Sequence, residues 1–372
     1  MAGEVPEPPQ PRYTVDAGGS QVLSRGADAV VYAATDNVTD SPVAMKVLHN
    51  DDPRAVAGFR QEADMLMRVQ SPHVVAGLAQ GEFDNGAPYV VMERLSGTDL
   101  RTHLSTAGGP LSLDETLRIG AGIAAGLSAT HDAGIVHRDV KPENVMLGTD
   151  GSVKLVDLGI AAYQDPAVPD LNPNAGSIGY LAPERIPTSE QPPPRGEPAT
   201  DLYGLGSVIY EMASGGKAFP GSDVVAVLTA QVHGDVQPLD QVADVPKDVA
   251  DLVTGLMQPS PDARPQQAAD VQQQLVAFAA RETAADTAQD VTQIAALGMD
   301  GAHTALSAGR DAGSDVGRDQ QGQGPGPGRE SAAMQPGDAA ATTPAPGPQD
   351  QTSGNQPDLG PDPPSAELSK EM

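Results

Sequence analysis

Apolar residues recur regularly between Tyr13 and about Arg281, and their spacing changes from strand-like to helix-like along the chain. In the first third, short β-rich runs alternate with turn residues, at 20–35, 41–49, 74–83 and 87–95. A helical spacing of three and four residues interrupts these runs, with apolar residues at Phe59, Ala63, Leu66 and Met67. This pattern predicts five strands, two of them within 20–35 around a turn, and one helix.

The remainder of the regular region has mostly helical spacing. The stretch at 111–134 has Leu, Ile and Ala spaced for a buried helix. The stretch at 199–216 predicts a second buried helix, capped by Thr200 and stopped by glycine. The fold class is therefore predicted to be α+β, with a small β-rich N-lobe and a larger α-helical C-lobe. A cleft between two such lobes is a natural ligand site.

The two ends of the chain differ from this regular region. Residues 1–12 are rich in proline, and the last aromatic residue is Phe278. Residues 282–372 are dominated by Gly, Pro, Ala, Gln, Asp and Thr. Such segments bury too little apolar surface to offset the loss of chain freedom on folding. We therefore predict disorder at 1–12 and 282–372, with a weak helix near 287–297.

The charge and cysteine content narrow the function classes. Lys and Arg total 22 against 50 Asp and Glu, a formal net charge of -28. This balance argues against nucleic-acid binding and against docking on anionic lipid; it favours solubility, with adaptation to high salt as a minor alternative. The chain has no cysteine, which excludes disulfides and fits a reducing compartment. No signal peptide or apolar run long enough to span a bilayer occurs, so we expect a cytoplasmic protein without a membrane span.

Chemistry-bearing residues are densest at HRDVKPEN (137–144) and at VDLG (156–159). An Asn and an Asp offer hard oxygens of the kind that Mg²⁺ prefers. Three further motifs accompany them, VAMK (43–46), GSIGYLAPER (176–185) and SPDARP (260–265). A merely charged loop is the alternative, but eight residues matching one motif in order argue against it.

Together these motifs resemble those of the bacterial eukaryotic-like serine/threonine protein kinases, over about residues 13–281. The resemblance implies the bilobal protein kinase fold. The N-lobe is expected at 13–92, the hinge at 93–96 and the C-lobe at 97–281. The expected reaction is ATP-dependent phosphorylation of Ser and Thr hydroxyls on proteins, including autophosphorylation.

The resemblance assigns catalytic roles by matching position. Lys46 would hold the α- and β-phosphates of ATP, and Glu62 would pair with Lys46. Asp139 would orient the substrate hydroxyl and accept its proton. Lys141 would neutralise the γ-phosphate, and a lysine at this position goes with Ser/Thr specificity.

The resemblance also implies the metal and nucleotide contacts. Asn144 and Asp157 would hold Mg²⁺, with Mn²⁺ as an alternative ion. The adenine would lie in an apolar slot. Its expected contacts are roof residues Leu23, Val31 and Ala44, floor residue Met146, gatekeeper Met92, and a hinge from Glu93 to Leu95.

Other motif residues are expected to hold the scaffold. Leu158 replaces the commoner Phe and should pack against His137 and Leu66. Glu184 would form a buried ion pair with Arg264. The remaining expectations are that Asp201 braces the catalytic-loop backbone and that the Ser177 hydroxyl bonds Asp139 and Lys141.

The glycine-rich loop departs from the family pattern. Ser24, Gly26 and Ala29 stand at its three glycine positions. Glycine lets backbone N–H groups approach phosphates closely, so we expect a stiffer loop, with weaker ATP affinity or slower turnover but not inactivity.

The activation segment departs as well, since residues 158–176 contain neither Ser nor Thr. Arg138 therefore lacks the phosphothreonine that such an arginine usually binds. Either Asp165 or Asp170 supplies a fixed negative charge, or Arg138 is simply retained and other contacts order the segment. The sequence leaves both interpretations open.

Two other function classes compete with an active protein kinase. A pseudokinase scaffold would bind nucleotide or a partner with little catalysis, and the degenerate glycine loop favours it. A small-molecule kinase shares the catalytic Asp and Asn, but the APER and DARP elements are typical of protein kinases. Expected partners are protein substrates, a second kinase domain through self-association, and a forkhead-associated domain that would bind phosphorylated Thr283 or Thr287.

Overall fold

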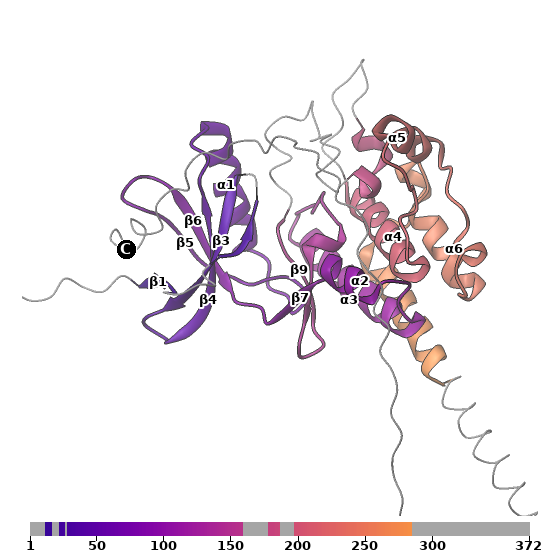
Figure 1. Ribbon diagram of the computed structural model, residues 1–372, viewed down its shortest axis with the longest axis horizontal. Coiled ribbons are helices and arrows are strands. Elements are labelled where there is room, and N and C mark those ends of the chain that lie inside the picture. The colour runs from indigo at the N-terminus through magenta and orange to yellow at the C-terminus, as the bar shows by residue number, and fades with distance from the viewer. Residues whose placement is uncertain (1–11, 17–21, 27, 159–177, 187–196, 285–372) are drawn as a thin grey trace, which may run out of the picture. The chain divides into compact units, whose positions relative to one another are not determined.

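The computed structural model describes residues 12–16, 22–26, 28–158, 178–186 and 197–284 (Figure 1). Its first part is an antiparallel sheet in the order β1-β3-β4-β6-β5, with β2 also paired to β3. The strands are β1 (Tyr13–Val15), β2 (Val22–Arg25), β3 (Ala29–Asp36), β4 (Ser41–Leu48), β5 (Gly77–Glu82) and β6 (Pro88–Glu93). One helix, α1 (Pro53–Leu66), packs against β5 and β6.

The register of this sheet determines which side chains share a face. Directly paired residues of an antiparallel sheet point to the same side, and the pairs Val31–Lys46 and Ala44–Met92 follow in register across β3, β4 and β6. Four residues of the predicted ATP site therefore lie on one face. The opposite face buries a separate apolar cluster of Tyr13, Ala34, Val43, Met45, Val47 and Val91.

Helix α1 begins earlier than its apolar spacing indicated. Asp52 is its N-cap, and the Asp52 side chain accepts a hydrogen bond from the N–H of Arg54. Pro53 at the first position needs no hydrogen-bond partner for its nitrogen. Phe59, Ala63 and Leu66 are buried as the spacing predicted. The prediction was wrong for Met67, which is the C-cap and is 38% exposed because the helix has already ended.

The second part is mainly helical (Figure 1). Its helices are α2 (Leu100–Ala107), α3 (Leu113–Asp132), α4 (Pro198–Ser214), α5 (Val224–His233) and α6 (Lys247–Leu256), followed by helical residues 268–284. A small sheet in the order β7-β8-β9 consists of β7 (Gly97–Asp99), β8 (Val145–Gly148) and β9 (Val153–Leu155). Single 3₁₀ turns are η1 (Pro142–Asn144), η4 (Ile178–Tyr180), η5 (Pro183–Arg185), η6 (Leu239–Gln241) and η7 (Pro261–Ala263).

Helix α4 is the centre of the helical core, and its start corrects one prediction. Every residue from Ala199 to Ala213 is buried. Its N-cap is Glu197, not Thr200, because Pro198 starts the helix with a preset φ. The Thr200 hydroxyl instead accepts the N–H of Glu197 as part of a capping box. The predicted glycine stop is confirmed at Gly215, with a φ of 74°.

One apolar cluster joins the two parts of the fold. It combines residues of β4, α1 and β6 with Ile135 and Leu158, which belong to the helical part. Val75 also donates its N–H to the carbonyl of Leu155 at 2.9 Å. The strand-then-helix order confirms the predicted α+β class. Among the described residues, no helix has the length and apolar character needed to cross a bilayer.

Candidate active site

Lys46 lies between two carboxylates from the two parts of the fold. Its Nζ is 2.6 Å from Glu62 Oε1 of α1 and 2.9 Å from Asp157 Oδ1, just after β9. Burial alone would lower the pKa of Lys46, but the carboxylates of Asp157 and Glu62 outweigh it and raise the pKa. Lys46 in turn lowers the pKa of Asp157. The site therefore keeps a protonated amine beside an ionised Asp157.

The catalytic-loop motif folds into a compact polar cluster around Asp139. Lys141 Nζ lies 2.7 Å from Asp139 Oδ2. The amide nitrogen of Asn144 donates to both Oδ2 and the backbone carbonyl of Asp139, each at 2.8 Å. Three hydrogen-bonding contacts thus hold Asp139, the candidate acid–base residue, close to the Lys141 ammonium group and the Asn144 amide.

The donor set fits a hard divalent cation. The Asn144 amide nitrogen is directed at Asp139, so its side-chain oxygen is the atom left for coordination. Asp157 contacts Lys46 through Oδ1, and its side chain is 47% exposed, so its second oxygen is the atom available for coordination. One neutral and one charged oxygen, with phosphate and water, is a donor set that suits Mg²⁺.

Asp201 holds the catalytic loop by its backbone. Its Oδ2 accepts the N–H of His137 at 2.8 Å, and its Oδ1 accepts the N–H of Arg138 at 2.6 Å. Arg138 has a φ of 68°, a left-handed conformation that is unfavourable for a side-chain-bearing residue. His131 Nε2 lies 2.8 Å from the same Oδ2. Asp201 therefore offsets local backbone strain beside Asp139, the bracing role that the motif predicted.

A buried ion pair fastens the end of the activation segment. Arg264 donates to both carboxylate oxygens of Glu184, at 2.8 and 2.7 Å, and its side chain is fully buried. This is the pair expected from the APER and DARP motifs. Leu158 is 2% exposed and shares the apolar cluster of Leu66, also as expected. Its contact with the buried His137 stays a prediction.

A second polar network was missed by sequence reasoning. Arg101 of α2 contacts Glu143 of η1 and Glu211 of α4, each at 2.8 Å. The hydroxyl of Tyr180 bonds both Arg101 and Glu211. Burial, reinforced by Glu211, raises the pKa of Tyr180. No motif marks Arg101, because its partners lie 42 to 110 positions away and meet only through packing.

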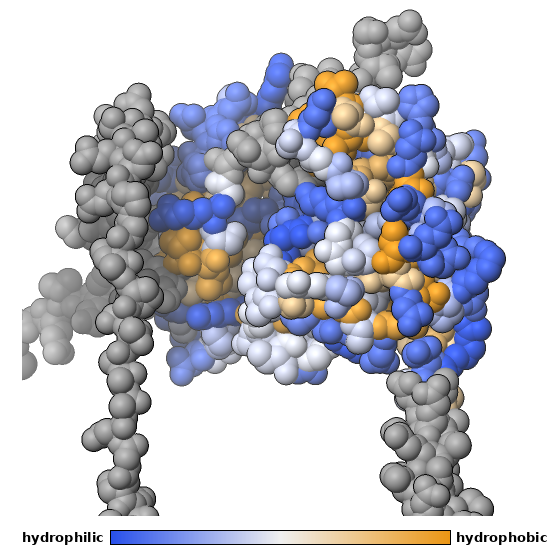
Figure 2. All heavy atoms as spheres, turned by 45° about the vertical axis from the view of Figure 1, so that its right-hand side comes forward, coloured by the Kyte–Doolittle hydropathy of each residue, from blue (hydrophilic) through white to orange (hydrophobic). Residues whose placement is uncertain are grey.

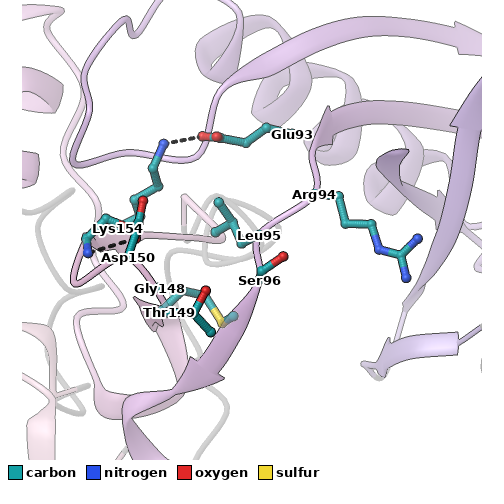
Figure 3. A pocket seen from close by; sticks show the side chains of 10 residues that line it. Glu93, Arg94, Leu95, Ser96, Gly148, Thr149, Asp150 and Lys154 are labelled. Atoms are coloured by element: carbon teal, nitrogen blue, oxygen red, sulfur yellow. Dashed lines mark hydrogen bonds and ion pairs between the residues drawn. The ribbon is translucent and has the colours of Figure 1, made fainter. Parts of the chain in front are cut away.

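Residues 93–96, the predicted hinge, border a pocket of about 310 Å³ (Figure 3). Its lining includes the predicted nucleotide contacts Glu93, Leu95 and Met146, together with residues of the β8–β9 hairpin. Figure 3 shows Lys154 reaching across to Glu93, a contact of 2.6 Å. The lining does not include the roof residues Leu23, Val31 and Ala44.

The predicted roof residues Leu23, Val31 and Ala44 lie on β2, β3 and β4, and Ser24 and Ala29 of the predicted glycine-rich loop lie on β2 and β3. The pairing of β2 with β3 shifts register between Val22 and Ser24, so Leu23 sits at a bulge and is 46% exposed. Ser24 pairs with Val31. Gly26 donates its N–H to the carbonyl of Ala29 at 2.8 Å, which closes the loop into a tight turn.

Several predictions fall outside the described residues. They are the Ser177 contacts, the fixed charges at Asp165 and Asp170, the Thr287 site, and disorder at 1–11 and 285–372. Arg12 is described, and it pairs with Asp36 at 3.1 Å. The lobe and hinge limits stay predictions, as do the catalytic and nucleotide-binding roles of the residues above.

Comparison with known proteins adds an independent observation to this geometry. The model of the protein kinase domain matches residues 19–276. This chain belongs to the protein kinase family. The matched span includes Ser24, Lys46, the catalytic loop and Arg264, so the motif resemblance and the family assignment cover the same residues.

Curated relatives of this kinase chain come from several bacteria. The probable serine/threonine-protein kinase pknA2 of Bifidobacterium longum is 34% identical over 70% of this chain and 34% of its own length. The probable serine/threonine-protein kinase PknB of Corynebacterium glutamicum is 36% identical over 63% and 36%. The serine/threonine-protein kinase PknL of Mycobacterium tuberculosis is 32% identical over 65% and 59%. The match thus spans about a third of the first two relatives and under two thirds of the third.

Proposed function

We propose that this kinase transfers the γ-phosphoryl group of ATP to Ser and Thr hydroxyls of proteins, in bacterial signalling. The observation that carries the proposal is the assembled set of Lys46, Glu62 and Asp157 beside Asp139, Lys141 and Asn144. The relatives described above are all named as serine/threonine-protein kinases, which supports the substrate class.

The proposed mechanism relies on positioning and charge neutralisation, since phosphoryl transfer has a loose transition state. Asp139 orients the acceptor hydroxyl and takes its proton as the hydroxyl oxygen bonds to the γ-phosphorus. The bond from the γ-phosphorus to the β–γ bridging oxygen breaks, and ADP leaves. Lys141, in contact with Asp139 at 2.7 Å, neutralises the transferred phosphoryl group, and Lys46 holds the α- and β-phosphates.

We assign Asn144 and Asp157 to the metal, with Mg²⁺ as the first choice and Mn²⁺ as the alternative. A bound divalent cation would neutralise phosphate charge during transfer. Leu23, Val31, Ala44, Met92 and Met146 are assigned to the adenine slot and Glu93 to Leu95 to the hinge. Chelation with EDTA is expected to stop transfer, and restoring Mg²⁺ is expected to recover it.

The deciding experiment follows phosphate from labelled ATP to the protein itself and to a generic basic protein. Asp139→Asn is expected to abolish both. Asp251→Asn is the matched control, because Asp251 is an exposed residue of α6 whose ion pair with Lys247 is exposed as well. Nucleotide binding without transfer by the wild type would replace the proposal with a pseudokinase scaffold. Transfer to a small molecule but not to protein would favour a small-molecule kinase.

Two partners belong to the same proposal. Figure 2 shows apolar patches between hydrophilic side chains on the helical part of the surface. Val225 and Val232 of the helix α5 are exposed apolar side chains, at 70% and 48%. They support self-association of the kinase domain. Sedimentation should then show a dimer that the Val225→Asp substitution dissociates. A wild-type protein that stays monomeric at high concentration would contradict the proposed self-association.

The second partner is a forkhead-associated domain that binds phosphorylated Thr283 or Thr287. Thr283 lies at the end of helical residues 268–284, where its hydroxyl donates to the Ala279 carbonyl at 3.0 Å. Phosphorylation would replace this local bond with an exposed dianion. Calorimetry with a forkhead-associated domain should detect binding that Thr283→Ala or Thr287→Ala removes. Equal binding by the double variant would contradict it.

We place this activity in the cytoplasm, where ATP and Mg²⁺ are plentiful. A chain without cysteine forms no disulfides, so it does not need an oxidising compartment in order to fold. Fractionation of cells that produce the protein should recover it in the soluble fraction after the membranes have been pelleted. Recovery with the membrane pellet would contradict this placement.

A further inference from the structure

The end of the glycine-rich loop that precedes β3 is held by the side chain of Asn50, which lies outside the loop. Asp28 lies between Gly26 and the first residue of β3. Its backbone carbonyl accepts the N–H of His49 at 2.9 Å. Its Oδ1 accepts a hydrogen bond from the Asn50 amide nitrogen at 2.6 Å. The loop is therefore fastened to the residues that follow β4, by one backbone bond and one side-chain bond.

The same asparagine also contacts the start of α1. The Asn50 side-chain oxygen accepts the N–H of Asp52 at 3.0 Å. Asp52 is the N-cap of α1, since its carboxylate accepts the N–H of Arg54 at 2.7 Å and its carbonyl accepts that of Val56 at 3.0 Å. One amide group thus bridges the loop and the cap of a helix.

Helix α1 carries Glu62, which holds Lys46 in place. A chain of contacts therefore runs from the loop through Asp28, Asn50 and Asp52 to the helix of the Lys46–Glu62 pair. An amide is suited to the bridge because it donates through nitrogen and accepts through oxygen. A carboxylate at Asn50 could accept from Asp52 but would repel Asp28.

We propose that Asn50 is a positioning residue that couples the phosphate-binding loop to the start of α1. Its donor bond also keeps the Asp28 carboxylate turned toward the amide. This coupling supports the loop where two of the family's three glycines are replaced, at Ser24 and Ala29. The part of the inference that concerns ATP rests on the proposed function.

The test exchanges donor and acceptor between the two positions. Asn50→Asp is expected to raise the KM for ATP roughly three- to tenfold with a smaller change in kcat, because the loop is released and two carboxylates face each other. The double variant Asp28→Asn, Asn50→Asp restores one donor facing one acceptor, and an oxygen still faces Asp52. It is expected to return the KM to within about twofold of wild type. Failure of the double variant to recover would overturn the coupling.

Amide hydrogen exchange without nucleotide provides a readout that does not depend on catalysis. Asp28→Ala leaves Asn50 and Asp52 unchanged, so a local role predicts faster exchange in the loop alone. Coupling predicts faster exchange also at Asp52, Arg54 and Val56. If the helix start does not respond, the inference fails. If the helix start responds in Asp28→Ala but the wild-type protein transfers no phosphate, the proposed function fails and the coupling stands. Thermal melting of each variant separates these outcomes from global unfolding.

Discussion

At the scale of single residues, Arg264 has an acceptor for each of its five N–H groups. Two bonds go to Glu184, and the others go to the carbonyls of Gln258, Ala199 and Pro259. Arginine alone offers five donors in a planar fork. The residue therefore ties the end of the activation segment to α4 and to the loop before η7.

Arg264→Lys is expected to destabilise the kinase by about 3–5 kcal/mol, because a lysine leaves buried acceptors unsatisfied and cannot bind Glu184 bidentately. Urea unfolding measures the change. Lys247→Ala is the control, since its pair with Asp251 is exposed and should cost no more than about 1 kcal/mol. Equal effects of the two substitutions would contradict the importance of burial.

Tyr180 gives the stability a dependence on alkaline pH. Its folded-state pKa is raised by burial and by Glu211, above the ordinary tyrosine value of about 10. Below pH of about 10 both folded and unfolded states keep the proton, so stability is unaffected. Above it the unfolded chain ionises first, and stability is lost as the pH rises toward the folded pKa.

Tyr180→Phe should therefore flatten the fall of stability between about pH 9.5 and 11, although it removes hydrogen bonds at neutral pH. Urea midpoints measured across this range provide the comparison with wild type. An unchanged slope would mean that other buried tyrosines, such as Tyr203, account for the alkaline loss.

At the scale of elements, α4 approaches the catalytic loop at a glycine. A Cβ added at Gly204 would lie 2.8 Å from Val140 Cβ and 2.9 Å from the Val140 carbonyl oxygen. Val140 directly follows Asp139 in the chain. The position of Asp139, the proposed catalytic residue, is thus set partly by how closely one helix backbone packs.

Gly204→Ala is expected to lower kcat several-fold and to destabilise the fold by about 1–3 kcal/mol, because the added methyl displaces the Val140 backbone. Gly255→Ala in α6 is the matched control. Apart from its chain neighbours and the adjacent backbone of its own helix, no atom of the described residues lies within 4 Å of a Cβ added at Gly255, so this substitution should stabilise the fold by about 0.5–1 kcal/mol. Measuring kcat and the thermal unfolding of both variants tests this expectation. An unaffected Gly204→Ala enzyme would refute the packing argument.

Sequence reasoning predicted the elements that have strong periodicity or a motif. Lys46 and Glu62 stand sixteen positions apart on a strand and the next helix, and Glu184 and Arg264 belong to two motifs, so their contacts could be predicted. The cap of α4 could not, since Pro198 and Thr200 are both plausible helix starts and only the backbone distinguishes them. The Arg101 network and the Asn50 bridge depend on long-range packing, which no local pattern encodes.

At the scale of the whole molecule, the formal charge of -28 is large for 372 residues. Excess charge of one sign opposes compaction, and salt screens it over distances beyond about 10 Å at 0.1 M. Buried contacts such as the Lys46 pairs are screened much less.

The melting temperature is accordingly expected to rise between about 0.02 and 0.3 M NaCl, because screening relieves repulsion more than it weakens exposed ion pairs. KCl should give the same rise, which separates screening from binding of a particular cation. A melting temperature that falls with either salt would indicate that exposed ion pairs outweigh the net charge.

The position of Lys46 between Glu62 and Asp157 also bears on the thermodynamics of ligand binding. A free lysine side chain samples many rotamers, and fixing it costs up to about 2 kcal/mol. Here the side chain is already fixed at 2.6 and 2.9 Å from its two partners. An incoming phosphate would therefore substitute one oxyanion for another at an immobile ammonium group. The rotamer ordering is completed during folding, and it does not recur with each catalytic cycle.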